Sequence, residues 1–298
     1  MKALIIADLE GIIGIKNIYD KEHCETCLCK ELLKYVKYLK TNYSGVEITI
    51  CDCHNNGQTI LALQNILSEC HIVSCVWNID FDIIYDFALL VGFHAMSMKS
   101  SPFSHSFRPE IRQAKLGLKT VGELSLFANY LFYYNIPLLF ASGDAECIDE
   151  ISYMPCGKFS TSNRPIEILY KQLDDYLGTA LINTIPFIQY RNENVSIEFF
   201  NSDLIDILSR KGYKEYNEKY IKFENVFYFF QAIQTFCYDI IQSVQYIYKR
   251  NTKILKDYIL KYGQTRVHES IQKYDRRLLC QDISKVPYEV LKKALENC

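Results

Sequence analysis

The sequence Val91-Gly92-Phe93-His94-Ala95 decides how the rest of this chain is interpreted. It closes the apolar run 87–93, and a histidine follows that run at once. A short, fully apolar run predicts a buried strand of a parallel sheet, and a glycine near its end lets another backbone segment approach closely. We therefore expect His94 to leave the sheet at the carboxyl end of a central strand.

Two segments upstream show the same pattern, an apolar run followed by polar residues that can bind a metal. Asp8 and Glu10 follow the apolar run 2–7, and His54 follows the run 46–51. In extended chain Asp8 and Glu10 point the same way, so they repel one another unless a cation or a proton lies between them. Open α/β sheets place their sites at the carboxyl ends of strands. Three strands that each end in a ligand-type residue therefore predict one shared site.

Two further candidates lie downstream. His105 lies between two serines in a loop expected over 96–110, and Glu123 opens an apolar helix expected over 124–134. Either residue alone also fits an ordinary role, as an exposed histidine or as a glutamate favoured by the helix dipole. Beside a metal site, however, His105 could act as a mobile acid or base. Carboxylates and imidazoles together are the ligands of zinc and similar ions, so the set indicates a metal-dependent hydrolase.

The pattern up to about residue 150 alternates strands and helices. Strands are expected at 2–7, 46–51, 72–76, 87–93 and 136–141, helices at 22–41, 57–69, 124–134 and 145–151, and a hairpin around Gly117. This alternation predicts an α/β fold, with a mostly parallel central sheet flanked by helices.

The chain is expected to divide into three parts. Residues 156–165, rich in turn-forming residues, predict a linker, so the α/β metal-binding catalytic domain is assigned to 1–155. A second, smaller α+β region at 156–242 has expected helices at 166–183 and 226–248 and strands at 195–200 and 219–224. A helical C-terminal extension occupies 243–298. One helix face is expected to pack on its own subunit through Ile254, Leu255, Tyr258, Ile259 and Tyr262.

Composition excludes several partners. Lys and Arg number 33 against 35 Asp and Glu, so no basic excess points to nucleic acid. The longest apolar runs are far shorter than the roughly 20 residues that a membrane span needs. No signal peptide precedes the 12 cysteines, which predicts a cytoplasmic chain with free thiols. Cys24, Cys27 and Cys29 could supply part of a structural zinc site, but no second CxxC follows at finger spacing.

These segments together resemble the D-aminopeptidase family of zinc metallopeptidases, peptidase family M55. The resemblance runs from residue 1 to about 242. It is carried by Asp8-Leu9-Glu10-Gly11, Asp52-Cys53-His54, Gly92-Phe93-His94-Ala95, Ser104-His105-Ser106 and Val121-Gly122-Glu123-Leu124, with Asn129 downstream.

The resemblance implies two zinc ions per subunit. Asp8 would bridge them, Glu10 and His94 would complete one site, and His54 and Glu123 the other. His105 would be the catalytic histidine. The implied activity is release of N-terminal amino acids, D-residues in particular, from short peptides by a metal-activated water. The implied assembly is a homo-oligomer, a ring-shaped decamer. The chain departs from the family pattern in three places. The segment between Gly11 and the second strand is shorter, the segment after Met154 is short with its basic stretch reduced to Lys158 and Arg164, and the tail past about 243 has no counterpart in the family.

Other functions fit the same residues. The altered loops allow another metal-dependent amidohydrolase on the same scaffold, such as an amidase or deacylase. A non-catalytic peptide-binding or assembly protein is a further alternative, although five competent ligand residues argue against it. A cysteine nucleophile at Cys51 or Cys53 beside His54 ranks lowest, because neighbours in an extended strand seldom face each other.

Overall fold

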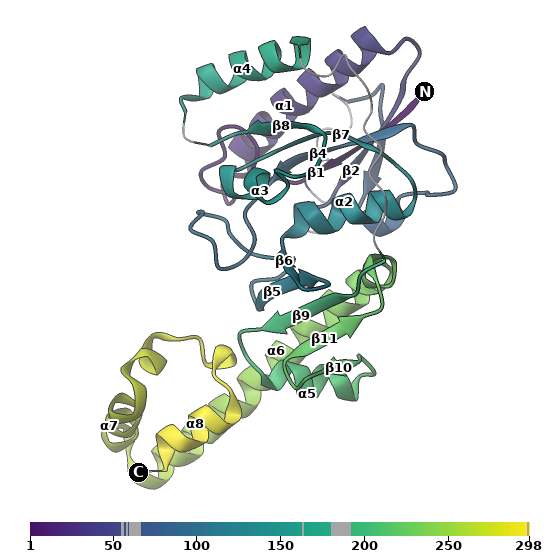
Figure 1. The fold of residues 1–298 in the computed structure, drawn as a ribbon. Coiled ribbons are helices and arrows are strands. Elements are labelled where there is room, and N and C mark those ends of the chain that lie inside the picture. Colours follow the sequence, from purple (N-terminus) through teal and green to yellow (C-terminus); the bar gives the residue numbers. More distant parts are fainter. Residues whose placement is uncertain (55–56, 58, 60–66, 163, 180–191, 297) are drawn as a thin grey trace.

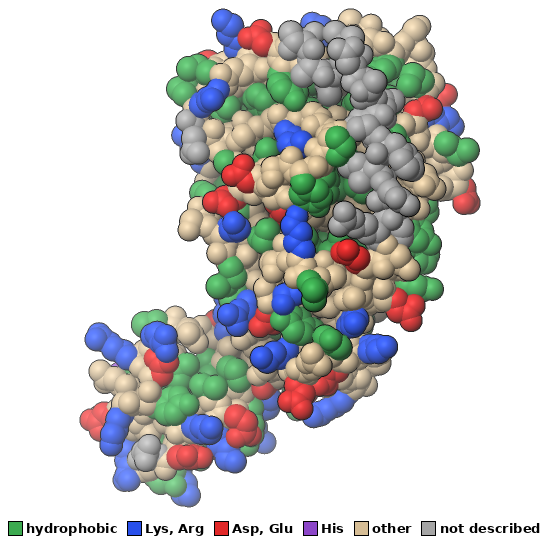
Figure 2. All heavy atoms as spheres, viewed as in Figure 1, with side chains coloured by type: hydrophobic (Ala, Val, Ile, Leu, Met, Phe, Trp, Pro, Cys, Tyr) green, Lys and Arg blue, Asp and Glu red, His purple; other side chains and the backbone are tan. Residues whose placement is uncertain are grey.

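A computed structural model of the chain describes residues 1–54, 57, 59, 67–162, 164–179, 192–296 and 298. Figure 1 shows three parts that follow one another along the molecule: a layered α/β part, a smaller sheet, and a helical C-terminal part. On the face drawn in Figure 2, side chains of both charge signs are interspersed, in keeping with a net charge of −2.

The α/β part is built on a six-stranded sheet in the order β3-β2-β1-β4-β7-β8, and every neighbouring pair is parallel. Its strands are β1 (Lys2–Ala7), β2 (Glu47–Asp52), β3 (His71–Ser74), β4 (Phe87–Phe93), β7 (Leu138–Gly143) and β8 (Gly157–Ser160). The five strands expected from the sequence are confirmed within one or two residues. The expected linker at 156–165 is wrong, because β8 lies within it and pairs with β7 at the sheet edge.

Helices cover both faces of this sheet (Figure 1). On one face, α1 (Lys21–Asn42) packs beside α4 (Ile166–Thr179), and on the other lies α2 (Glu123–Tyr133). The short helix α3 (Ala145–Glu150) connects β7 to β8. Most of the helix expected at 57–69, and the end of that expected at 166–183, lie outside the described residues. The predicted α/β class is confirmed.

The second sheet is antiparallel, in the order β10-β11-β9-β5-β6. Its strands are β5 (Ile111–Leu116), β6 (Lys119–Val121), β9 (Val195–Phe199), β10 (Glu215–Tyr216) and β11 (Tyr220–Phe223). The hairpin expected around Gly117 is confirmed as β5–β6, and the glycine takes a φ of +59° at its turn. Because β5 pairs with β9, this hairpin from the first part of the chain completes the sheet of the second.

One long helix joins the second sheet to the C-terminal part. The helix α6 (Val226–Tyr262) begins at the cap Asn225 and ends at Gly263, so the helix expected at 226–248 continues without a break across residue 243. A further helix, α5 (Asp203–Arg210), was not predicted. The terminal helices α7 (Gln264–Asp275) and α8 (Tyr288–Leu295) are joined by the short 3-10 helices η4 (Arg276–Cys280) and η5 (Ile283–Lys285), and a further one, η3 (Val76–Asn78), lies between β3 and β4.

The end of α6 shares a small core with α7 and α8. Four of the five residues expected to form the packed face, Ile254, Leu255, Tyr258 and Tyr262, contact this core, whereas Ile259 is exposed. The tail thus packs on its own subunit, as expected. Within the described part of the chain, no helix has the length and apolar character that crossing a membrane requires.

A buried carboxylate joins α1 to the strand ends. Glu31 is fully buried, and its carboxylate accepts the Ile13 amide at 2.8 Å and the Tyr35 hydroxyl at 2.8 Å. Ser142 lies against the same carboxylate at 3.4 Å and accepts the Gly92 amide. Burial raises the pKa of Glu31 to about 7, although these hydrogen bonds act in the opposite direction.

This raised pKa predicts a pH-dependent stability. A carboxyl whose folded pKa exceeds its unfolded value stabilises the fold most at low pH, and loses that contribution as pH rises from about 4.5 to about 7. Across this pH window, wild type should lose roughly 2–3 kcal/mol more of its free energy of unfolding than Glu31→Gln, which keeps the shape of the side chain but cannot titrate. Urea unfolding of zinc-free protein at a series of pH values measures how the free energy of unfolding depends on pH in each protein. The same pH dependence in both would contradict the prediction.

Candidate metal centre

Glycines bring the ends of the central strands together. The Asp8 amide donates to the Val91 carbonyl and the Gly11 amide to the Gly92 carbonyl, at 2.9 and 2.8 Å. Gly92 has a φ of +73°, a conformation that favours glycine. A Cβ on Gly11 would lie 1.8 Å from the Phe93 carbonyl oxygen. Because neither position can carry a side chain, the segments that follow β1 and β4 can touch, and this contact places Asp8 beside His94.

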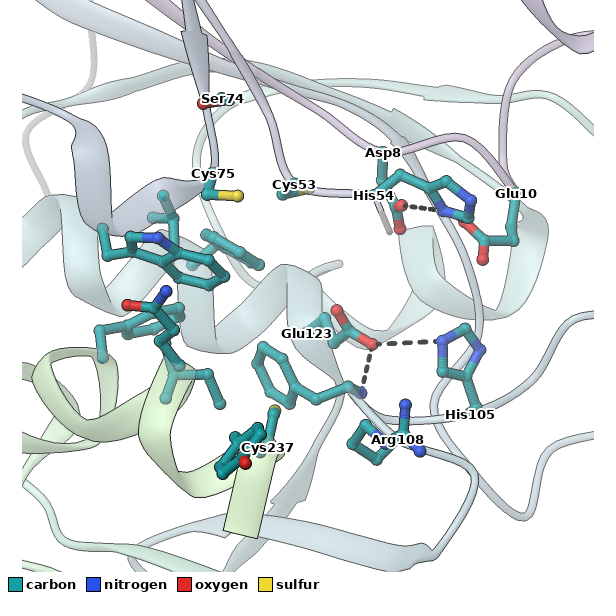
Figure 3. A pocket seen from close by; sticks show the side chains of 18 of the residues that line it. Asp8, Glu10, Cys53, His54, Ser74, Cys75, His105, Arg108, Glu123 and Cys237 are labelled. Carbon is teal, nitrogen blue, oxygen red and sulfur yellow. Dashed lines mark hydrogen bonds and ion pairs between the residues drawn. The ribbon is translucent and has the colours of Figure 1, made fainter. Parts of the chain in front are cut away.

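The five residues predicted as metal ligands line one cavity of about 980 Å³. Figure 3 labels four of them, Asp8, Glu10, His54 and Glu123. Asp8 lies between two histidines: its Oδ1 is 3.5 Å from His54 Nδ1, and its Oδ2 is 3.5 Å from His94 Nε2. The same two ring nitrogens also lie close to the remaining carboxylates. His54 Nδ1 is 2.9 Å from Glu10 Oε2, and His94 Nε2 is 3.4 Å from Glu123 Oε1.

Candidate ligand atoms fall into three sets whose members all lie within 4.8 Å of one another. These sets are Asp8 with Glu10 and His54, Asp8 with His94 and Glu123, and Glu10 with His94 and His105. Asp8 is shared by the first two sets, which is the place that a bridging carboxylate would take. These two sets pair Glu10 with His54 and Glu123 with His94, whereas the resemblance implied the opposite pairing.

Opposite charges dominate the electrostatics of this cluster. Burial alone would lower the pKa of His54, but its hydrogen bonds to Asp8 and Glu10 raise it to about 10. Burial acts the same way on His94, and contact with Glu123 and Asp8 raises its pKa to about 10. In turn, His54 and His94 hold the pKa of Asp8 below its ordinary value, and chiefly His94 does so for Glu123, in both cases against the effect of burial. Protons on the histidines thus balance the carboxylates where a metal cation could do so instead.

Three observations show that these residues fit a zinc-type ion. Asp8 Oδ2 is buried and accepts no hydrogen bond from the described residues, so it is available to a cation. His94 Nδ1 donates to the Ala95 carbonyl at 2.9 Å, which leaves Nε2 facing the carboxylates, as in ligating histidines. All donors are carboxylate oxygens or imidazole nitrogens, which zinc accepts readily.

His105 stands beside the cluster on the loop before β5. Its Nδ1 donates to the Phe103 carbonyl at 2.9 Å, and its Nε2 lies 3.9 Å from Glu123 Oε1. The ring stacks on that of His94, with 4.1 Å between centroids, and the side chain is 30% exposed. His105 is therefore both adjacent to the candidate ligands and accessible from the cavity.

Asp52 and the cysteine cluster have structural roles. The Asp52 carboxylate accepts hydrogen bonds from the main-chain amides of His54 and Thr59, and so holds the backbone at His54. Cys24, Cys27 and Cys29 are buried in the core between α1 and the sheet. None of the candidate metal-binding groups found among the described residues includes them.

Sequence reasoning missed the other wall of the cavity. The Phe107 amide donates to Glu123 Oε1 at 2.6 Å, and Arg108 follows it into the cavity. The helix α6 contributes Phe230, Ile233 and further residues, more than 100 positions after Glu123. Its aromatic content was visible in the sequence, but nothing local indicated where this helix would pack.

The N-terminal half of the chain matches a known protein family. The family model for D-aminopeptidases, peptidase family M55, matches residues 1–162. A curated D-aminopeptidase of Bacillus subtilis (strain 168) is 25% identical over 166 residues, which are 50% of this chain and 58% of that protein. The match thus spans less than two thirds of that relative.

A solved structure has the same fold. It is described as the Zn-dependent D-aminopeptidase DppA from Bacillus subtilis, a self-compartmentalizing protease, and superposes with a TM-score of 0.70 at 19% identity. The alignment covers 81% of this chain and 98% of that one. Because the family model covers more than half of its length, the chain belongs to the D-aminopeptidase family.

Proposed function

We propose that this protein is a zinc-dependent aminopeptidase that releases N-terminal amino acids, D-residues in particular, from short peptides. Asp8, Glu10, His54, His94 and Glu123 would hold two zinc ions per subunit, with Asp8 between them. The observation that carries the proposal is the meeting of these five side chains around a buried Asp8 oxygen that accepts no hydrogen bond within the described residues.

The residues of the chain have separable roles in this reaction. Zinc, when bound, would lower the pKa of a water molecule and polarise the scissile carbonyl. His105 lies at the accessible edge of the cluster, where its Nε2 can donate a proton to the leaving amine or stabilise the developing oxyanion. The Phe107 amide holds one oxygen of Glu123 and thereby orients that carboxylate.

Metal content measured together with peptide turnover tests the proposal. Purified protein should contain zinc, and it should cleave D-Ala peptides faster than L-Ala peptides. A panel of acyl amides run beside them separates a peptidase from an amidase or deacylase. Zinc-loaded protein that binds peptides but releases no amino acid would favour the non-catalytic alternative.

We further propose a cytoplasmic homo-oligomer, a ring-shaped decamer. The support is the solved neighbour, which is described as a self-compartmentalizing protease and is covered over 98% of its chain. Light scattering after size exclusion should give a mass of ten 34.8 kDa chains. A monomer or dimer at micromolar concentration would overturn this assembly.

Zinc binding is expected to release protons and to strengthen with rising pH. His54 and His94, with pKa values raised to about 10, are protonated at neutral pH, and zinc requires their neutral form. For each proton released, affinity should rise up to roughly tenfold per pH unit between about pH 6 and pH 9. Calorimetry in buffers of different ionisation enthalpy counts the protons. An affinity independent of pH would contradict this expectation.

A further inference from the structure

The cavity beside the candidate metal centre has an apolar wall. Away from the metal ligands it is lined by residues of η3, α2 and α6, chiefly Trp77, Phe127, Phe230, Ile233 and Ile241. Glu123 and His105 line the same cavity as these apolar side chains. A group bound at the metal centre can therefore extend over aromatic and aliphatic surface.

One arginine lines this space. Arg108 is the only Arg or Lys among the described residues that line the cavity. It follows Phe107, whose amide binds Glu123, and it is three residues after His105, so one short segment carries all three groups. Burial raises the pKa of Cys237 on α6 to about 12, and the charge of Arg108 opposes that rise, which places the guanidinium within electrostatic reach of α6.

The guanidinium is held in place but retains free donors. Glu110 accepts Nε at 3.2 Å and Nη2 at 3.3 Å, and the side chain of Arg108 is 30% exposed. Nη1 makes no hydrogen bond to any described residue. An arginine with one edge fixed by a carboxylate presents its remaining N–H groups in a defined direction, as the binding of a second carboxylate requires.

We propose that Arg108 binds the C-terminal carboxylate of a short peptide, while the side chain of its last residue lies on the apolar wall. This inference rests on the proposed function and narrows it to peptides with a free carboxylate and an apolar residue after the released one. A carboxylate bound in this space needs a cation to offset its desolvation, and Arg108 is the only arginine or lysine among the described residues that line it.

Kinetics with D-Ala-D-Phe and its C-terminal amide test the inference. Wild type should show a kcat/KM roughly 10- to 100-fold higher for the acid, as expected for a charged hydrogen-bonded pair. Arg108→Gln should lose that preference through a higher KM for the acid, with the amide unchanged. Arg108→Lys, which keeps the charge without the fork, should fall between them. The matched control is Arg112→Gln: this arginine is 51% exposed, pairs with Glu198 and does not line the cavity, so it should behave as wild type.

The outcomes separate this inference from the proposed function. Peptide hydrolysis with equal kcat/KM for acid and amide, or an equal loss on both in Arg108→Gln, would overturn the inference and leave the aminopeptidase intact. Binding of both peptides to zinc-loaded His105→Ala protein, measured by calorimetry, gives a readout that needs no turnover. Tighter binding of the acid, lost when Arg108→Gln is added, supports the inference even if hydrolysis fails; equal binding of acid and amide overturns it. Unchanged zinc content in Arg108→Gln establishes that the variant is folded.

Discussion

Replacing His94 by alanine is expected to abolish stoichiometric zinc binding and to reduce peptide hydrolysis to background. Its Nε2 lies within 3.5 Å of both Asp8 and Glu123, so its loss leaves two buried carboxylates without their shared partner. The reduction should exceed the roughly 10- to 100-fold loss that follows removal of a residue that only orients a ligand. Zinc is measured by atomic absorption on dialysed protein and hydrolysis by release of the free amino acid.

Two further histidine variants make this result interpretable. His105→Ala should lose about 10²- to 10⁴-fold in rate, as expected for an acid–base group, while it keeps its zinc. His268→Ala, at an exposed position of α7, should keep both zinc and activity. Full zinc content in His94→Ala, or loss of zinc in His105→Ala, would contradict the assigned roles.

Gly11→Ala is expected to be the most destabilising single-methyl change near the site. The added Cβ would lie 1.8 Å from the Phe93 carbonyl oxygen and 2.8 Å from the Gly92 carbonyl carbon, and a backbone cannot yield as a side chain can. The segment after β1 must then move away from the end of β4. We expect the free energy of unfolding to fall by about 3 kcal/mol or more, the upper end for overpacking. Zinc affinity should fall with it, because Asp8 and Glu10 move as well.

Gly45→Ala provides the matched control. Gly45 has a φ of +69°, but a Cβ there would meet no atom within 4 Å. This variant should therefore be destabilised only by backbone strain, by about 1–2 kcal/mol, and should keep its zinc affinity. Urea unfolding and zinc titration of both variants measure the two effects. Equal zinc affinity in Gly11→Ala and wild type would show that close approach of the strand ends does not shape the site.

The segments that build the large sheet were predictable because each carries its own local signal. Fully apolar runs such as 2–7 and 87–93 have few alternatives to a buried strand, and the polar residues that end them face the same edge of a parallel sheet. The edge strand β8 was missed for the converse reason. Its four residues, Gly157–Ser160, lie among turn-forming residues, and only pairing with β7 makes them a strand.

By itself, the sequence determined the residue types of the candidate site and the strand ends that carry them, because both follow from short-range patterns of apolar and polar residues. Only the tertiary structure decided that the β5–β6 hairpin pairs with β9, that α6 forms the apolar wall, and that Arg108 faces the cavity. These contacts join segments some 80 to 130 residues apart, and no local pattern records them. They depend on which apolar faces remain uncovered once the large sheet and its helices have packed.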